Sequence, residues 1–350
     1  MQKVINGIQQ IGIGVADAKA VFNWYRRHLG FDILVFQDVA TASLMTRYTG
    51  DIAYERCALL ALNMVGGGGL EIWQFKNRTP IPPTQTVQIG DLGINLMKIR
   101  ARDLYKIHAR LKNISLEQLT ELGNEPHFFF VDPWNNLVQV VEEDYVFSDG
   151  KCSSGGVLGV MVGVSDMEIS LKFYQELLGY DIVLSDRIGT FADLDNLKGG
   201  KGVFRRVILR HGDRATGGFS ELYGPSQIEL VQTLDRMPNK IYKNRFWGDL
   251  GYIHLCYDIQ GMDRLSYESK KMNYPFTVDS ADSFDMGEAA GRFGYLEDPD
   301  GTLIELVETH KVPILKRLGI YINLKKRNPI RPLPKWLVKA MKIHRVAFDL

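Results

Sequence analysis

The segment from Ile11, "IGIGVADAKAVFNWYRRHLGFDILV", changes its hydrophobic period twice. Apolar residues that suit a strand come first, an amphipathic stretch with helical spacing follows, and a second strand closes the segment. Asp17 stands where the helix should begin, because its side chain can accept hydrogen bonds from the first turn. Gly30 stands where the helix should end, because glycine tolerates left-handed backbone angles. The pattern therefore predicts a strand, a helix and a second strand.

The same pattern recurs from Val160, in "VMVGVSDMEISLKFYQELLGYDIVL", with its aspartate and glycine again thirteen residues apart. A second pair of segments also repeats, "GDLGINL" from Gly90 and "GDLGYIHL" from Gly248. Each leads through a helical pattern to an Asp-Pro turn and a strand, "VDPWNNLVQVVEE" or "EDPDGTLIELVET". The chain thus contains two repeats of about 155 residues, and each consists of two shorter units.

Each unit is predicted to contain a strand, a helix and about three further strands, the last of which form hairpins. The glycine run in "MVGGGGLEIWQF" favours a flexible hairpin turn, because it lacks the GK[ST] and the following helix of a phosphate-binding loop. The Gly- and Ser-rich segment 147–156 is typical of a linker. We therefore predict two domains, 1–146 and 147–310, and a C-terminal extension, 311–350.

Charge is unevenly distributed along the chain. The 350 residues carry a formal net charge of +1, which gives no global bias toward nucleic acid or membrane. From His310 onward, however, eleven Lys or Arg accompany a single acid. This basic tail either lies on the acidic remainder or reaches for an anionic partner or membrane surface. Its apolar stripe, which includes Trp336 and Leu337, favours docking on the protein itself.

The three cysteines, Cys57, Cys152 and Cys256, form no CxxC pair and do not indicate a disulfide framework. The first residues, "MQKVINGIQQ", lack the apolar run of a signal peptide. No stretch approaches the roughly 20 apolar residues of a membrane span. We therefore expect a cytoplasmic protein with reduced thiols, no nucleic-acid partner and no stable membrane association.

The four tandem units resemble the vicinal oxygen chelate superfamily, which includes glyoxalase I, bleomycin-resistance proteins and extradiol dioxygenases. The resemblance rests on the repeated "D…FY…LGF" and "DPDG…IEL" patterns and covers residues 7–310. It implies an α+β fold in which four βαβββ units form two half-open barrels, followed here by the basic extension. It also implies a divalent metal inside a barrel, held by side chains on the first and last strands of the units.

Carried over position by position, the resemblance gives each unit two candidate ligand positions. In chain order these are Gln10 and Glu71, Asn95 and Gln139, Gly159 and Glu229, and His254 and Glu305. Divalent metals prefer imidazole and carboxylate to a neutral amide, and only the last unit offers both. Glu305 also interrupts an apolar strand, where a buried carboxylate needs a cation or hydrogen-bond donors. The alternative is an exposed or arginine-paired glutamate, and the coincidence with His254 favours the metal.

The identity of the third ligand depends on which units pair. If adjacent units pair, as in extradiol dioxygenases, the ligands are Glu229, His254 and Glu305, and the first domain holds no metal. If outer units pair, as in fused two-site glyoxalases, Gln10 and Glu71 join His254 and Glu305 in a combination that matches one glyoxalase I pattern. The short linker favours adjacent pairing, because two consecutive half-barrels are the simpler topology. The metal could be Zn, Ni, Mn or Fe.

The resemblance implies that the metal chelates two neighbouring substrate oxygens and stabilises charge on them. The favoured function is that of a glyoxalase-like lyase, isomerase or epimerase in which Glu305 or Glu229 moves a proton. A ring-cleaving, extradiol-type oxygenase is the alternative. Tyr295, ten residues before Glu305, supports the oxygenase unless its ring merely fills the core, but Gly159 stands where that class has a histidine. A non-catalytic binder that resembles bleomycin-resistance proteins is the third option.

Other polar residues are candidates for substrate contact. Ser280, Ser283 and Asp285 line either a substrate mouth or, as we favour, a plain surface loop. Arg206, on a predicted strand, either binds an anionic group of the substrate or is a solvated charge. We expect a small molecule as the substrate, and a homodimer is one option for the assembly.

Overall fold

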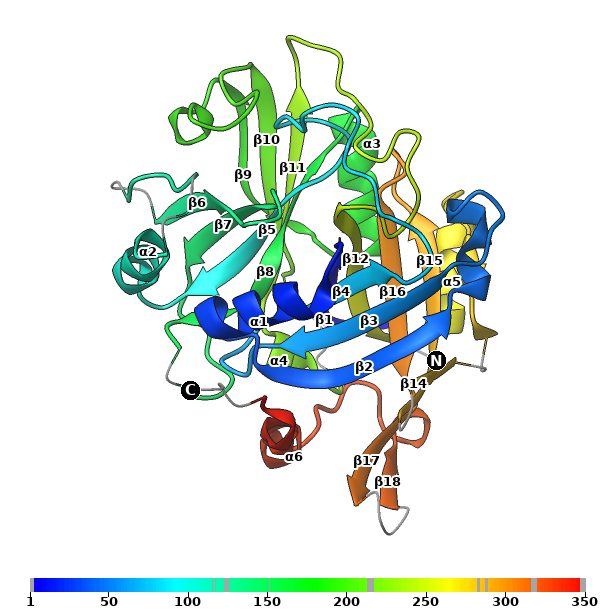
Figure 1. Ribbon diagram of the computed structural model, residues 1–350. Coiled ribbons are helices and arrows are strands. Elements are labelled where there is room, and N and C mark those ends of the chain that lie inside the picture. Colours follow the sequence, from blue (N-terminus) through cyan, green and yellow to red (C-terminus); the bar gives the residue numbers. More distant parts are fainter. Residues whose placement is uncertain are drawn as a thin grey trace.

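The computed structural model describes residues 3–114, 116, 118–122, 126–150, 152–212, 217–281, 284–286, 289–315 and 320–346. Two curled sheets form its centre, and Figure 1 shows the C-terminal extension below them. Sheet A has the strand order β13-β15-β16-β12-β1-β4-β3-β2, with β14 paired to β15. It comprises β1 (Val4–Gly14), β2 (Ile33–Thr41), β3 (Glu55–Leu62), β4 (Gly69–Phe75), β12 (Gly251–Gln260), β13 (Val278–Asp279), β14 (Phe284–Met286), β15 (Ala289–Glu297) and β16 (Leu303–Thr309).

Sheet B is smaller and has the strand order β6-β7-β5-β8-β11-β10-β9. It comprises β5 (Gly93–Ala101), β6 (His127–Val131), β7 (Leu137–Glu142), β8 (Ser154–Gly163), β9 (Ile182–Gly189), β10 (Phe204–Arg210) and β11 (Gln227–Thr233). In the second unit, an isolated bridge between Leu119 and Phe130 is the described counterpart of the second strand. The predicted α+β architecture of four tandem units in two half-open barrels is confirmed.

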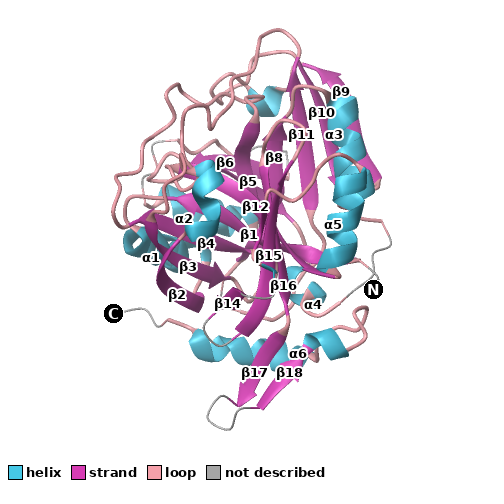
Figure 2. Ribbon diagram, turned by 90° about the vertical axis from the view of Figure 1, so that its right-hand side faces the viewer, coloured by secondary structure: helices cyan, strands magenta, loops and turns pink. Residues whose placement is uncertain are grey.

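Each unit places one helix after its first strand. The helices are α1 (Ala18–Leu29), α2 (Leu104–Lys112), α3 (Met167–Lys172) with its π-helical continuation Phe173–Leu177, and α5 (Met262–Lys271). The predicted ends of α1 are confirmed, because Asp17 accepts a hydrogen bond from the amide of Ala20 and Gly30 has a φ of 73°. Figures 1 and 2 show α1 and α2 together on one side of the molecule and α3 and α5 on the other.

The sheets pair the units differently from the favoured prediction. The antiparallel contact of β1 with β12 joins units one and four in sheet A, and β5 with β8 joins units two and three in sheet B. Adjacent pairing was therefore wrong, and both sheets take strands from both sides of residue 147. The predicted linker, 147–156, is partly strand, because β8 begins at Ser154.

Adjacent units meet on the outer faces of the sheets instead. The hydroxyl of Tyr25 in α1 donates to Asp132 of the second unit at 2.7 Å, and Tyr174 donates to Asp298 of the fourth unit at 3.0 Å. Each tyrosine lies eight residues after the aspartate that begins its helix, and each acceptor belongs to a repeated Asp-Pro turn, so the repeats record a contact between neighbouring units. Burial raises the pKa of Asp298 to about 6, although amide and hydroxyl donors lower it in part.

One hydrophobic core lies between the four helices and the outer faces of both sheets. It includes Ile11 and Ile13 of β1, Met97 of β5, Val160 of β8 and Leu255 of β12, all of which are fully buried. Because side chains alternate along a strand, the neighbouring positions of these strands face the inside of the two half-barrels. We therefore expect functional side chains on the inner faces.

The C-terminal extension contains a hairpin of β17 (Lys311–Leu315) and β18 (Ile320–Asn323), the helix α6 (Lys335–Lys339) and a 3-10 turn, Ala340–His344. Leu337 of α6 belongs to a buried cluster with Leu60 and Leu62 of β3. Arg345 also forms an ion pair of 3.0 Å with Asp32. Docking of the extension on the protein is thus confirmed.

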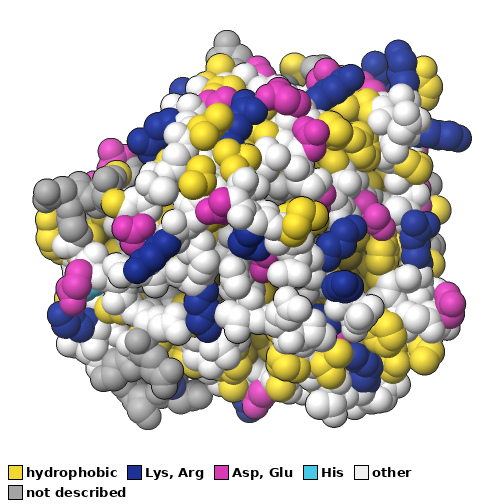
Figure 3. Space-filling model, turned by 90° about the horizontal axis from the view of Figure 1, so that it is seen from above, with side chains coloured by type: hydrophobic (Ala, Val, Ile, Leu, Met, Phe, Trp, Pro, Cys, Tyr) yellow, Lys and Arg dark blue, Asp and Glu magenta, His cyan; other side chains and the backbone are white. Residues whose placement is uncertain are grey.

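One part of the predicted stripe is wrong, because Trp336 is 67% exposed. Leu60 lies opposite Glu71 in the sheet, so the extension packs at the end of the inner face of sheet A. No helix in the described parts of the chain is long and apolar enough to span a membrane. On the face seen from above, basic and acidic side chains are interspersed (Figure 3).

Candidate metal centre

Four neighbouring strands of sheet A present the candidate ligands on its inner face. His254 on β12 places Nε2 3.0 Å from Oε2 of Glu305 on β16 and 3.3 Å from Oε2 of Glu71 on β4. Nε2 of Gln10 on β1 donates to Oε2 of Glu305 at 3.3 Å. One ligand atom each of Glu71, His254 and Glu305 lies within 4.8 Å of the others. The outer pairing of units therefore brings two ends of the chain to one site.

The register of the strands explains this convergence. Gly12 of β1 lies opposite His254 on one side and Glu71 on the other. Cys256 of β12 lies opposite Gln10 and Glu305 in the same way. Residues directly opposite each other share a face of the sheet, so all these positions face inward. Gly12 also makes space for the imidazole ring of His254. A Cβ added at this position would lie 2.4 Å from Cε1 of the ring and would force the ring to shift.

The cluster is buried and strongly coupled. His254 is 0% and Glu305 7% exposed, while Glu71 is half-buried. Burial by itself lowers the pKa of His254, but the carboxylates of Glu305 and Glu71 outweigh it and raise that pKa to about 9. Burial raises the pKa of Glu305, yet His254 and the donors of Tyr295 and Cys256 bring it below its usual range. Both groups are thus charged at neutral pH, as His⁺ and carboxylate.

The donor set fits a divalent metal. Two carboxylates and one imidazole are ligand types that Zn, Ni, Mn and Fe accept, and Gln10 can add an amide oxygen. Within the described part of the chain, Oε1 of Gln10 and Nδ1 of His254 are buried without a hydrogen-bond partner. Such orphaned atoms are costly, and coordination of the amide oxygen would relieve one of them. Bringing a dication to two carboxylates would also displace the proton of His254.

Aromatic side chains form the wall beside the cluster. Tyr295 on β15 lies opposite Glu305, and its ring centre is 5.6 Å from that of His254. Trp247 packs against Trp73 at 4.5 Å and against Tyr295 at 6.2 Å between ring centres. Burial, and then the charge of Glu305, raise the pKa of the Tyr295 hydroxyl. Tyr295 is therefore both a core residue and a neighbour of the candidate ligands.

A cavity of about 470 Å³ opens beside this wall and is lined by Tyr48, Trp247, Ile253 and Leu303, among others. Leu303 lies opposite His254 and two residues before Glu305 on the same strand. Through Leu303 and Ile253, the cavity is lined by the two strands that carry Glu305 and His254, and we call it the sheet-A cavity. Its size falls within the range of small-molecule sites.

Glu229 does not join the cluster, which corrects the predicted ligand set. It lies on β11 in sheet B, where its carboxylate is 2.5 Å from Nζ of Lys98 and 2.7 Å from Arg206. Burial raises the pKa of Glu229, but Lys98 and Arg206 outweigh it and hold that pKa low. Arg206 also contacts Asp193 at 2.9 Å, so its guanidinium binds protein carboxylates rather than lying free for a substrate. The prediction failed because it depended on adjacent pairing.

The remaining candidates lie away from the cluster or outside the description. Asn95 donates to the carbonyl of Asp91 and accepts from the amide of Gly90, so it fixes a turn. Ser280 accepts a hydrogen bond from the amide of Phe293 in the strand next to it. Ser283 lies outside the described residues, and the side chain of Asp285 is not described.

Sequence reasoning missed Cys256, which lies between Gln10 and Glu305 on the inner face. Its position two residues after His254 on one strand was the available indication, because such residues share a face. Burial raises the pKa of the Cys256 thiol, and Glu305 raises it further. The thiol therefore stays protonated and can donate a hydrogen bond to the carboxylate.

No protein-family model and no curated protein sequence matches the chain. Among solved structures, glyoxalase I from Zea mays is similar with a TM-score of 0.54 and 14% identity, over 88% of this chain and 92% of that one. A provisionally assigned dioxygenase from Bacillus subtilis gives a TM-score of 0.56 and 14% identity, over 88% and 86% of the two chains. The protein therefore shares its fold with these two solved structures, as the resemblance of its repeats implies.

Proposed function

We propose that the protein is a metal-dependent enzyme of the glyoxalase type, a lyase or isomerase acting on a small molecule. The observation that supports this most is the convergence of two carboxylates, an imidazole and an amide on one buried face. The Gln-Glu-His-Glu combination resembles a glyoxalase I pattern, and a solved glyoxalase I shares the fold. The ligands we propose are Gln10, Glu71, His254 and Glu305. This set replaces the one predicted from the sequence, which contained Glu229.

A divalent ion bound there would act as a Lewis acid that stabilises negative charge on substrate oxygens. Glu305 is our candidate for the residue that moves a proton next to a carbonyl. Nε2 of Gln10 donates a hydrogen bond of 3.3 Å to Oε2 of Glu305. The strand that carries Glu305 also lines the sheet-A cavity through Leu303. Because its pKa is below the usual range, Glu305 is in the basic form at neutral pH. Trp247 and Tyr295 form a buried aromatic wall beside this position.

The test combines metal analysis with an isomerase assay on the purified protein. The protein is expected to bind one Zn, Ni, Mn or Fe and to convert a 2-oxoaldehyde hemithioacetal to the hydroxyacyl thioester. Glu305→Gln should retain the fold and lower kcat by about a hundredfold or more, because the proton-transfer group is lost. Failure to bind any of these metals would reject the enzyme proposal in favour of a metal-free binding protein.

A ring-cleaving oxygenase is the second candidate, and Tyr295 is the observation that favours it. The tyrosine lies against both His254 and Glu305, where it could donate a proton to a bound substrate. Iron oxygenases of this type prefer two histidines and one carboxylate, whereas this cluster contains one histidine. Oxygen consumption with a catechol by the iron-loaded protein would decide for the oxygenase, and its absence would reject it.

A further inference from the structure

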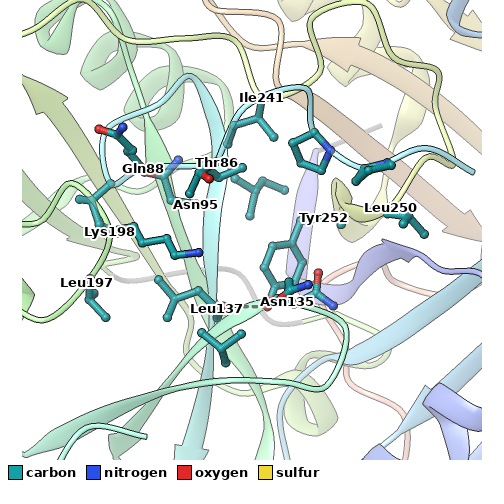
Figure 4. Close-up of a pocket in the computed structure, with 18 of the residues that line it drawn as sticks. Thr86, Gln88, Asn95, Asn135, Leu137, Leu197, Lys198, Ile241, Leu250 and Tyr252 are labelled. Carbon is teal, nitrogen blue, oxygen red and sulfur yellow. Dashed lines mark hydrogen bonds between the residues drawn. The ribbon is translucent and has the colours of Figure 1, made fainter. Parts of the chain in front are cut away.

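A second cavity, of about 340 Å³, opens at the end of the half-barrel that sheet B forms (Figure 4). The two cavities are built from corresponding parts of the repeats. The sheet-B cavity uses residues 131–137, 197–198 and 82–89 where the sheet-A cavity uses residues 297–303, 47–50 and 240–247. The starts of β5 and β12 contribute to both. The second half-barrel has therefore kept an opening like that of the first.

The charge of this second cavity is simple. Lys198 is the one charged side chain among its lining residues, which include no Asp or Glu. Figure 4 shows the ammonium of Lys198 directed into the cavity, toward the space between Asn95 and Tyr252. Among the described residues, no carboxylate forms an ion pair with it. The carbonyl of Lys198 accepts a hydrogen bond of 3.0 Å from the amide of Ile89, which fixes the segment against the opposite loop.

The rest of the lining combines apolar and amide groups. Leu137, Ile241 and Tyr252 supply apolar surface, and Gln88 and Asn135 supply neutral hydrogen-bonding groups. A mainly apolar lining with a few polar groups is typical of small-molecule sites, and the volume lies at the small end of their range. A single cation without a carboxylate partner favours a ligand that carries one negative charge.

The neighbouring inner face of sheet B offers no counterpart of the metal cluster in the described chain, where the one such group is that of sheet A. Leu96 occupies the position opposite Met161 that corresponds to His254 opposite Gly12. We propose that the sheet-B cavity is a second, non-catalytic binding site for a small organic monoanion, whose carboxylate pairs with Lys198. This proposal does not depend on the function proposed for sheet A.

The test uses two related probes, 4-hydroxybenzoate and its neutral counterpart 4-hydroxybenzamide, with gluconate as a third, non-aromatic carboxylate. Binding is measured by ligand-observed NMR and titration calorimetry on the full chain, with and without added metal. At least one carboxylate is expected to bind about tenfold more tightly than the amide. Lys198→Gln should weaken its binding about tenfold and leave binding of the amide unchanged. Lys201→Gln, a nearby exposed lysine outside the lining, is the matched control.

A third variant separates the two cavities. Lys240→Gln removes a cation from the lining of the sheet-A cavity and should leave binding of the carboxylate unchanged. The proposal is overturned if neither carboxylate binds at millimolar concentration. It is also overturned if Lys240→Gln weakens binding while Lys198→Gln does not, because the anion would then occupy the sheet-A cavity. His254→Ala, which removes a candidate metal ligand, should not affect binding at the sheet-B cavity.

Discussion

The two half-barrels share one scaffold but carry different chemistry at matching positions. The strand registers equate Gln10 with Gly159, Glu71 with Glu229, His254 with Leu96, Cys256 with Lys98, and Glu305 with Gln139. Both half-barrels thus have a carboxylate on the last strand of the odd-numbered unit, half-buried Glu71 in sheet A and buried Glu229 in sheet B. In sheet A that carboxylate contacts His254, and in sheet B it contacts the ammonium of Lys98.

This difference shows how one scaffold can compensate the same carboxylate in two ways. A buried carboxylate without a cation is strongly unfavourable, so replacement of the other ligands alone would leave Glu229 uncompensated. Lys98 and Arg206 supply the positive charge from within the chain. In sheet A, two carboxylates converge on one imidazolium, and this excess of negative charge is what a divalent ion would balance.

The largest expected effect concerns the metal itself. His254→Ala should reduce the bound metal from one ion per chain to none, because the imidazole touches both carboxylates. The measurement is metal analysis after dialysis. His127→Ala is the matched control, because His127 contacts Asp193 on the sheet-B side at 3.4 Å. Equal metal content in both variants would show that sheet A does not hold the metal.

A large effect on stability is expected in sheet B. Lys98→Met should lower the free energy of unfolding by about 3–5 kcal/mol, because Glu229 would remain buried with less positive charge. Denaturant unfolding measures the change. The double variant with Glu229→Gln should recover part of the loss, since it removes the uncompensated charge. Cys256→Ala, at the matching position of sheet A, should cost less, and an equal cost would contradict the proposed role of Lys98.

An intermediate effect should follow protonation of His254 in metal-free protein. Its folded pKa of about 9 exceeds the usual 6.5 of an unfolded histidine, so the associated stability is complete below pH 6.5. The free energy of unfolding should fall by up to about 3 kcal/mol as pH rises from 6.5 to 9. Unfolding at several pH values in chelator tests this, and His254→Asn should flatten the curve. A wild-type curve that rises over this window would contradict the ion-paired histidine.

The smallest change tests the fit of the imidazole. Gly12→Ala places a Cβ within 2.4 Å of the ring of His254, so the ring must shift and metal affinity should fall about tenfold. Titration with a competing chelator measures this affinity. Gly218→Ala is the control, because its Cβ would meet no atom closer than 3.7 Å. Met161, at the position of Gly12 in sheet B, shows that the scaffold accepts a side chain where no imidazole is present.

Local interactions made much of the fold predictable. Asp17 begins a helix and Gly30 ends it, each through contacts with residues a few positions away, so their spacing identified the units. The pair of His254 and Glu305 was predictable for a similar reason. Both lie within one unit, and the first and last strands of a unit are parallel neighbours, as β12 and β16 are.

The sequence by itself therefore determined the four units, the helix ends and two of the candidate ligands. Only the tertiary structure decided that Glu71, rather than Glu229, completes the cluster. The reason is that β1 pairs with β12, a strand that is far from it in the sequence. Registers between distant strands depend on the packing of whole faces, and bulges shift them by single residues. One such shift places Leu96, rather than Asn95, opposite Met161, so sheet B has an apolar residue at the position of His254.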